Sequence, residues 1–364
     1  MYVRAFCDRH ASSADGSGSF TGVVCIIPMF TRSAVIGQHF AFAHGRTGVL
    51  QQFLLTQSDV DRMLGAHDRH EMQQVLTELR FTHLTDQSLR NENDILAACQ
   101  AWVRKEVTSM TPKKLQPVFD ILWLDGDMPV LAYLLKQKKG LTSSISRLPE
   151  PPYAVYGAAA LRVLIEHDDG KGLPEHLTMF VRRIHAETIE DPRNIDAAVA
   201  QYAADAKLKL AAMSGSGAIG RYVRHHIDIQ NIRTVLRFPS EDRASSLPHL
   251  VYGGTIAPNT LLSTDRSIAA QARIAGFYEL ADTIDRPSED TNDIEHALNT
   301  ILAGDVAVLW NAILSVESLF AFAVTALAQI RLLRAIVIGK RNDLQPQDIK
   351  RMMPQFLSAS HYVL

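Results

Sequence analysis

Three segments of the chain share one apolar pattern at a constant separation. DMPVLAYLLKQKKG begins at Asp127, DIQNIRTVLRFPSE at Asp228 and QIRLLRAIVIGKRN at Gln329, so each start lies 101 residues beyond the one before. Apolar residues occupy the second, fifth, eighth and ninth positions of all three. Such a repeat constrains the fold more than any local motif, because each copy must bury its apolar face against its neighbours.

The spacing i, i+3, i+6 and i+7 follows one face of an α-helix and not the alternation of a strand. Further helix-like patterns lie at 49–79, 194–213 and 293–316. We therefore predict an all-α fold of three related helical units. The expected organisation is a divergent N-terminal segment at 1–40 followed by units at 41–140, 141–245 and 246–364.

Short polar residues suggest where two helices begin. Thr56 or Ser58 is a plausible N-cap for the helix that follows, with acidic residues in its first turn. Asp125 and Asp127 flank Gly126, and we expect them to cap a helix that starts there.

Basic residues gather at the carboxyl end of each repeated segment. Cations at this position complement the helix dipole, so their first explanation is structural. The alternative is that they bind an acidic surface of a partner. The candidate partner-binding residues are Lys136, Lys138, Lys139, Arg237, Lys340 and Arg341.

The composition is that of a globular protein, with 47% hydrophobic and 21% charged residues. A formal net charge of -2 argues against nucleic acid as a partner, because such proteins need a basic surface. The cysteines are Cys7, Cys25 and Cys99; their odd number and lack of C-x-x-C spacing fit a reducing cytosol. The first residues lack the plan of a signal peptide.

Residues 306–330 are apolar enough to suggest a membrane span, but they contain Asn311, Glu317 and Gln329. A span needs about 20 nearly uninterrupted apolar residues. We expect one long buried helix or two abutting helices here.

The stretch GSGAIG, Gly215 to Gly220, fits the G-x-G-x-x-G pattern that cradles a dinucleotide. That function requires a strand leading into the glycines, whereas the preceding AADAKLKLAAMS consists of good helix formers. We interpret the glycines as a tight turn between helices, and we expect no cofactor.

His225 and Asp228 have a spacing that could hold a metal on one helix face, but no third ligand is evident. The sequence contains no G-x-x-x-x-G-K-[ST] motif. We therefore predict no metal, no active site and no small-molecule substrate.

The ordered motifs resemble the C subunit (also called d, or AC39-like) of V-type and archaeal-type rotary ATPases. The resemblance covers about 44–353 and rests on an opening R-x-x-x-L helix, a helix with Asp and Asn, a Gly-Gly-Thr turn before Pro, and a final I-R-x-L-R-x-I-x-x-G-K run. The matching residues are Arg46 and Leu50; Asp228, Asn231, Ile232, Leu236 and Arg237; Gly253, Gly254, Thr255 and Pro258; and Ile330, Arg331, Leu333, Arg334, Ile336, Gly339, Lys340, Pro346 and Asp348.

This resemblance implies a funnel-shaped, all-helical spacer whose three units are related by pseudo-threefold symmetry, placed on the cytoplasmic face of a membrane rotor ring. It would receive the central stalk and carry torque between ATP turnover and H⁺ or Na⁺ transport, with no chemistry of its own. The implied partners are the central-stalk subunits and the rotor ring. The alternative is a helical-repeat scaffold with the same fold in another assembly.

Overall fold

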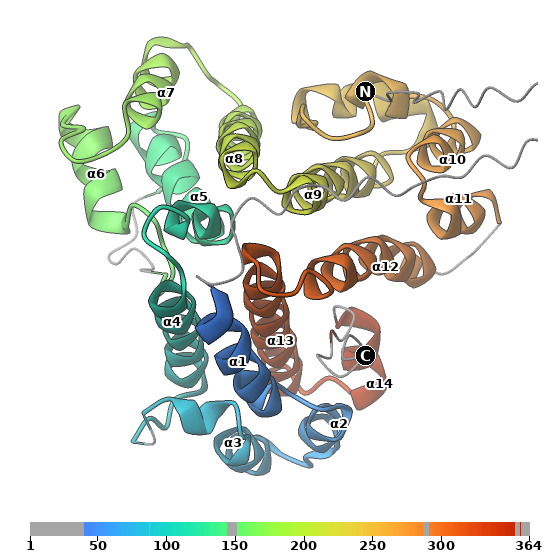
Figure 1. Cartoon of the computed structure of the whole chain (residues 1–364). Helices are drawn as coiled ribbons and strands as arrows, with labels where there is room; N and C mark the ends of the chain where they lie inside the picture. Colours follow the sequence, from blue (N-terminus) through green and yellow to red (C-terminus); the bar gives the residue numbers. More distant parts are fainter. Residues whose placement is uncertain (1–39, 87, 144–150, 287–290, 354–356, 358–364) are drawn as a thin grey trace, which may run out of the picture. The chain divides into compact units, whose positions relative to one another are not determined.

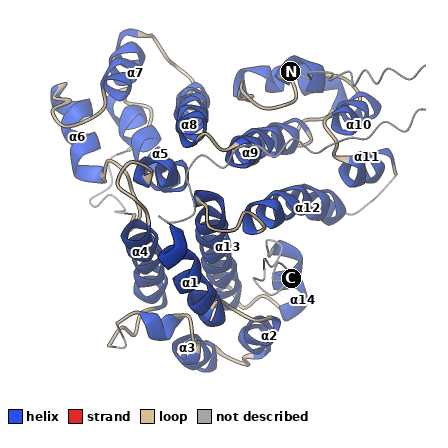
Figure 2. Ribbon diagram, viewed as in Figure 1, coloured by secondary structure: helices blue, strands red, loops and turns tan. Residues whose placement is uncertain are grey.

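The computed structural model describes residues 40–86, 88–143, 151–286, 291–353 and 357. Within these ranges the chain is helical and contains no strand (Figures 1 and 2), which confirms the predicted all-α class. The divergent segment expected at 1–40 lies outside the described residues except for Phe40.

The α-helices, in chain order, are α1 (Ala41–Leu50), α2 (Gln57–Gly65), α3 (Arg69–Glu78), α4 (Glu92–Met110), α5 (Asp120–Lys138), α6 (Ala158–His167), α7 (Glu175–Ala186), α8 (Pro192–Ser214), α9 (Gly217–Val235), α10 (Asp265–Ile274), α11 (Tyr278–Asp285), α12 (Thr291–Trp310), α13 (Val316–Arg341) and α14 (Pro346–Met352). The 3₁₀ helices are η2 (Gln51–Phe53), η3 (Thr82–Leu84), η4 (Gln116–Phe119), η5 (Ser240–His249) and η6 (Pro258–Leu261).

The three repeated segments lie on α5, α9 and α13, and each contributes to an apolar core. The first half of α5, the first half of α9 and nearly all of α13 share the largest core with α1–α4. The second half of α5 packs with α6, α7 and the start of α8. The second half of α9 packs with α10, α11 and the start of α12. The two smaller cores thus have the same order of elements, although the boundaries expected at 140/141 and 245/246 stay predictions.

The apolar stretch at 306–330 forms two abutting helices, one of the two predicted alternatives. α12 ends at Trp310 and α13 begins at Val316, with Leu314 between them at a φ of 55°. α13 is long and apolar enough to cross a membrane, but 72% of its apolar window is buried inside the protein. Core helices of soluble proteins have the same composition, so α13 is weak evidence for a span.

The two helix starts expected from the sequence differ in outcome. Thr56 caps α2 through a capping box with Asp59, as predicted. The expectation for Asp125 and Asp127 is wrong, because α5 already begins at Asp120 and both residues lie inside it. The predicted start depended on short polar residues alone, whereas the apolar run at 121–124 continues the helix towards its N-terminus.

A buried polar side chain begins each repeated segment. Asp127, Asp228 and Gln329 are at most 1% exposed. Asp127 accepts hydrogen bonds from the backbone N–H groups of Val155, Tyr156 and Gly157 at 2.6–3.1 Å. This carboxylate, positioned by α5, therefore holds the chain 28 to 30 residues further on.

Asp228 makes the corresponding contacts from α9. It accepts from the backbone N–H groups of Thr255 and Ile256 at 2.8 and 2.9 Å, 27 and 28 residues further on. Burial raises the pKa of both aspartates, while the backbone donors act in the opposite direction. The repeat detected in the sequence thus corresponds to a repeated contact.

Gln329 takes this position in α13, where the partners include carbonyl groups. Its Oε1 accepts from the N–H of Leu55 at 2.8 Å, and its Nε2 donates to the carbonyls of Leu55 and Leu357 at 3.3 and 2.9 Å. An ionised carboxylate cannot donate, whereas an amide both donates and accepts. This explains why Gln stands where the two earlier segments have Asp.

Asp120, the first residue of α5, is expected to make stability depend on pH. Burial raises its pKa from 3.8 to about 6, helped by the charge of Asp127 and opposed by that of Arg104. Because the pKa of Asp120 is higher in the folded protein than in the unfolded chain, the free energy of unfolding falls as the pH rises from about 4 through about 6. The half-buried Asp120 should therefore favour folding most in its protonated form.

Replacing Asp120 with Asn removes this ionisation. We expect Asp120→Asn to raise the free energy of unfolding by about 1–2 kcal/mol at pH 7.5, allowing for partial solvent screening, and to leave it nearly unchanged at pH 4. Urea unfolding at both pH values measures the difference. An equal gain at both would show that ionisation is not its cause.

Candidate functional site

The lysines at the end of α5 contact the ends of neighbouring helices. Lys138 donates to the carbonyl of Glu166 near the end of α6, at 3.3 Å. Lys139 donates to the carbonyls of His185 and Glu187 at the end of α7, at 2.9 and 2.7 Å. These ammonium groups therefore satisfy terminal carbonyls and complement the dipoles of α6 and α7 as well as that of α5.

Lys136, the third predicted cation on α5, forms an ion pair with Asp196 of α8 at 2.6 Å. The lysine side chain is 21% exposed and the aspartate 52%. This pair is therefore open to solvent on one side, where ion pairs contribute little to stability.

The basic end of α13 is tied to the N-terminal helices. Lys340 donates to the carbonyl of Ala66, directly after α2, at 2.6 Å. Arg341 forms an ion pair with Glu92, the first residue of α4, at 3.1 Å. The last helical turn of α13 is thus linked to the ends of two helices that precede it by about 250 residues or more.

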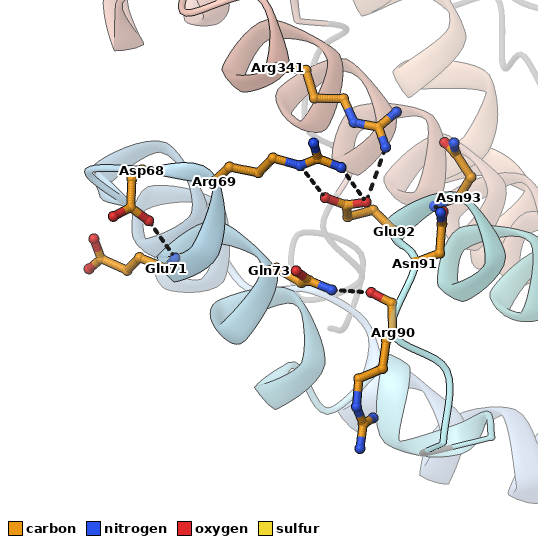
Figure 3. A network of polar contacts seen from close by, with 9 residues as sticks. All are labelled: Asp68, Arg69, Glu71, Gln73, Arg90, Asn91, Glu92, Asn93 and Arg341. Carbon is orange, nitrogen blue, oxygen red and sulfur yellow. Dashed lines mark hydrogen bonds and ion pairs between the residues drawn. The ribbon is translucent and has the colours of Figure 1, made fainter.

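Figure 3 shows Glu92 between two guanidinium groups, from Arg341 and from Arg69 of α3. The Glu92 side chain is only 2% exposed, and its oxygen lies 3.0 Å from Arg69. Burial alone would raise the pKa of Glu92, but the hydrogen bond from Arg69 and the charges of both arginines outweigh it and lower that pKa. Three helices, α3, α4 and α13, meet at this carboxylate.

Glu92→Gln tests this contact. We expect this substitution to lower the free energy of unfolding by about 1–2 kcal/mol at pH 7. The reason is that Arg69 and Arg341 lose the nearly buried negative charge with which both are paired. Glu78→Gln is the control: its pair with Arg62 has both side chains 47% exposed, so its effect should stay below about 0.5 kcal/mol. Equal effects in urea unfolding would contradict a special role for Glu92.

Arg237 differs from the other five predicted cations. It is exposed, and among the described residues its side chain has no hydrogen bond or ion pair. Arg237 lines a hollow beside the end of α9 together with Arg233. The predicted cations are therefore not brought together at one place by any contact in the described chain, and Arg237 is the one whose side chain binds no described group.

Of the GSGAIG stretch, Gly215 and Ser216 connect α8 to α9, as predicted, whereas Gly217 and Gly220 already belong to α9. Gly215 ends α8 with a φ of 68°, a left-handed conformation that glycine adopts without strain. Ser216 caps α9 by accepting from the N–H of Ile219 at 3.2 Å. Since a helix and not a strand leads into the glycines, the context of a dinucleotide fingerprint is missing.

His225 has a protein partner on a neighbouring helix. Its Nδ1 lies 2.7 Å from Asp305 of α12, which also pairs with Arg221 at 2.9 Å. The described ranges contain no group of three or more side chains suited to a metal.

Sequence reasoning missed a small cavity of 180 Å³ enclosed by α5, α8 and α9. Asp125 and Lys207 form an ion pair at its wall. Beside them lies His226, whose Nδ1 is buried without a described partner. Burial, followed by the charge of Lys207, lowers the pKa of His226 to about 4, so this ring is neutral at pH 7. No spacing in the sequence indicates this cavity, because its walls come from three separate helices.

Comparison with known families adds the decisive observation. Residues 43–352, from within α1 to the last residue of α14, match the family described as ATP synthase (C/AC39) subunit. The chain belongs to the C/AC39 family. No curated protein matches it.

Membership of the C/AC39 family makes the chain a V/A-type ATPase subunit of a structural kind. The matched residues include the buried Asp127, Asp228 and Gln329 and all six predicted cations, and they exclude residues 1–42. The contacts described above are therefore features of the C/AC39 region itself.

Proposed function

We propose that the chain is a non-catalytic connector in the rotor of a V-type or A-type rotary ATPase. In this role it links the central stalk to the membrane rotor ring while ATP turnover is coupled to H⁺ or Na⁺ transport. The observation that carries the proposal is the family match over residues 43–352. The pseudo-threefold, funnel-shaped arrangement of the three units is part of the same proposal.

The contacts between helices suit a part that transmits torque. α13 has 26 residues, about 39 Å of helix, and its second half is held by Gln329, Lys340 and Arg341. Side chains that join distant segments raise the cost of local opening. A body braced in this way deforms little when force is applied at one end.

Partner binding at the basic helix ends remains part of the proposal. Arg237 is best suited, because no described residue neutralises it. The cations at 136, 138, 139, 340 and 341 already bind carbonyl or carboxylate groups of this chain, so a partner would have to share or displace these contacts. We propose a peripheral location on the cytoplasmic face of the membrane, where stalk and ring meet.

The direct test is purification of the affinity-tagged full chain from native membranes. We expect stalk, rotor-ring and catalytic-head subunits to be recovered with it. Recovery of an unrelated assembly without these subunits would favour the scaffold alternative and overturn the connector function.

A charge reversal extends this test to the partner surface. Arg237→Glu should lower recovery of the stalk severalfold at low salt, because interface charges act on association and are screened by ions. The control is Arg80→Glu, which should leave recovery of the stalk unchanged. Arg80 is also exposed and has no described side-chain partner. Equal recovery with both variants would remove Arg237 from the interface.

A further inference from the structure

Four arginines line one hollow of 690 Å³ beside the end of α9. We call it the arginine hollow, after Arg233, Arg237, Arg243 and Arg286. These residues come from α9, the turn after it, η5 and the end of α11. Four like charges in one space repel one another unless anions neutralise them.

The acidic side chains of the arginine hollow are already engaged. Glu295 accepts from Arg233 at 2.6 and 2.8 Å in a bidentate pair. Asp265 is bound by Arg243. The remaining acid, Asp285, pairs at 2.7 Å with an arginine outside the hollow, Arg273.

Two guanidinium groups are left without a counter-charge. Arg237 and Arg286 are exposed, and within the described chain neither has a side-chain hydrogen bond or ion pair. Arg243 adds a third observation: its side chain is only 5% exposed, and its buried Nε has no described acceptor. Burying a charged side chain is costly unless it is fully paired, so the arginine hollow has donors that no described residue satisfies.

The walls of the hollow also include apolar side chains, among them Leu236, Ile284 and Leu298. A volume of several hundred Å³ with apolar walls and a few charged groups is typical of small-molecule sites. Planar guanidinium groups match the oxygens of phosphate in paired hydrogen bonds. Both properties favour a compact phosphate ester over an extended polypeptide.

We propose that the arginine hollow binds a small organic phosphate, with Arg237 and Arg286 contacting the phosphate oxygens. The proposal does not rest on the connector function, because every described residue that lines the hollow belongs to this chain; Arg237 is shared with the proposed stalk surface, so phosphate and stalk would compete for it. The phosphate can belong to a soluble nucleotide-like molecule or to a lipid headgroup, which share this chemistry.

Titration calorimetry on the purified full chain tests the site with pyrophosphate and ATP as soluble probes. Sedimentation with phosphatidylcholine vesicles containing phosphatidylinositol phosphate tests the lipid source. We expect saturable binding of at least one probe that weakens about tenfold in Arg286→Gln and further in the double variant with Arg237→Gln, since each removes a charged hydrogen bond. Arg80→Gln should bind as the unaltered chain does.

Thermal unfolding of each variant shows whether it is folded, and both substitutions are at exposed positions. Binding of the vesicles alone, with the same dependence on the arginines, supports the lipid source. The proposal is overturned if no probe binds at millimolar concentration, or if Arg80→Gln weakens binding as much as Arg286→Gln. It is also overturned if poly-glutamate binds through these arginines while every phosphate probe fails.

Discussion

Asp228→Ala is expected to lower the free energy of unfolding by about 3–4 kcal/mol, because it leaves the buried N–H of Ile256 and the part-buried N–H of Thr255 without their acceptor. The carboxylate is fully buried and binds the N–H groups of Thr255 and Ile256. Urea unfolding at pH 7 measures the loss.

Two further substitutions show whether the repeated contact is responsible. Asp127→Ala, at the corresponding place in α5, should cost a similar amount, whereas the exposed Asp61→Ala should change stability by less than about 0.5 kcal/mol. Asp228→Asn should be intermediate, since its amide has one acceptor oxygen in place of two. If Asp61→Ala and Asp228→Ala had equal effects, the buried carboxylate would not be the anchor we describe.

Gly254→Ala should be the second most damaging change, lowering the free energy of unfolding by about 2–4 kcal/mol through steric displacement of a buried anchor. A Cβ at this position would lie 2.1 Å from Oδ1 of Asp228 and 2.9 Å from its Cγ. Asp228 cannot move aside and keep both hydrogen bonds, because α9 fixes its backbone. Close packing against Asp228 therefore requires glycine here.

Gly304→Ala is the matched control for this prediction. Gly304 lies inside α12 and a Cβ there would meet nothing within 4 Å. Alanine is the better helix former, so this variant should gain about 0.5–1 kcal/mol. A neutral result for Gly254→Ala in the same unfolding assay would mean that the turn has more room than the structure shows.

The sequence predicted the helices well where the apolar period is long. α5, α9 and α13 were found from their shared spacing, and the cap at Thr56 from its residue type. Asp127 was recognised as the start of a repeat but misinterpreted as a helix cap. A carboxylate on a helix can bind its own first turn or a distant loop, and the sequence of the helix does not distinguish these.

The interaction sites were harder to predict, because their partners are distant in the sequence. The acceptors of Lys139 lie 46 and 48 residues away, and Glu92 is 249 residues from Arg341. A basic helix end has the same sequence whether it faces solvent or binds a neighbouring carbonyl. Only the fold shows that Arg237, unlike the other predicted cations, pairs with no residue in the described part of the chain.

The hydrogen bonds of Gln329 also bear on how the chain is made. Gln329, whose amide binds the backbone of Leu55, is synthesised 274 residues after Leu55. The whole of α13, against which α1–α4 pack, is likewise synthesised long after these four helices. During synthesis part of the apolar surface of the N-terminal helices α1–α4 therefore stays exposed until α13 has emerged from the ribosome. The core that α1–α4 share with α13 can therefore be completed only after α13 has been synthesised.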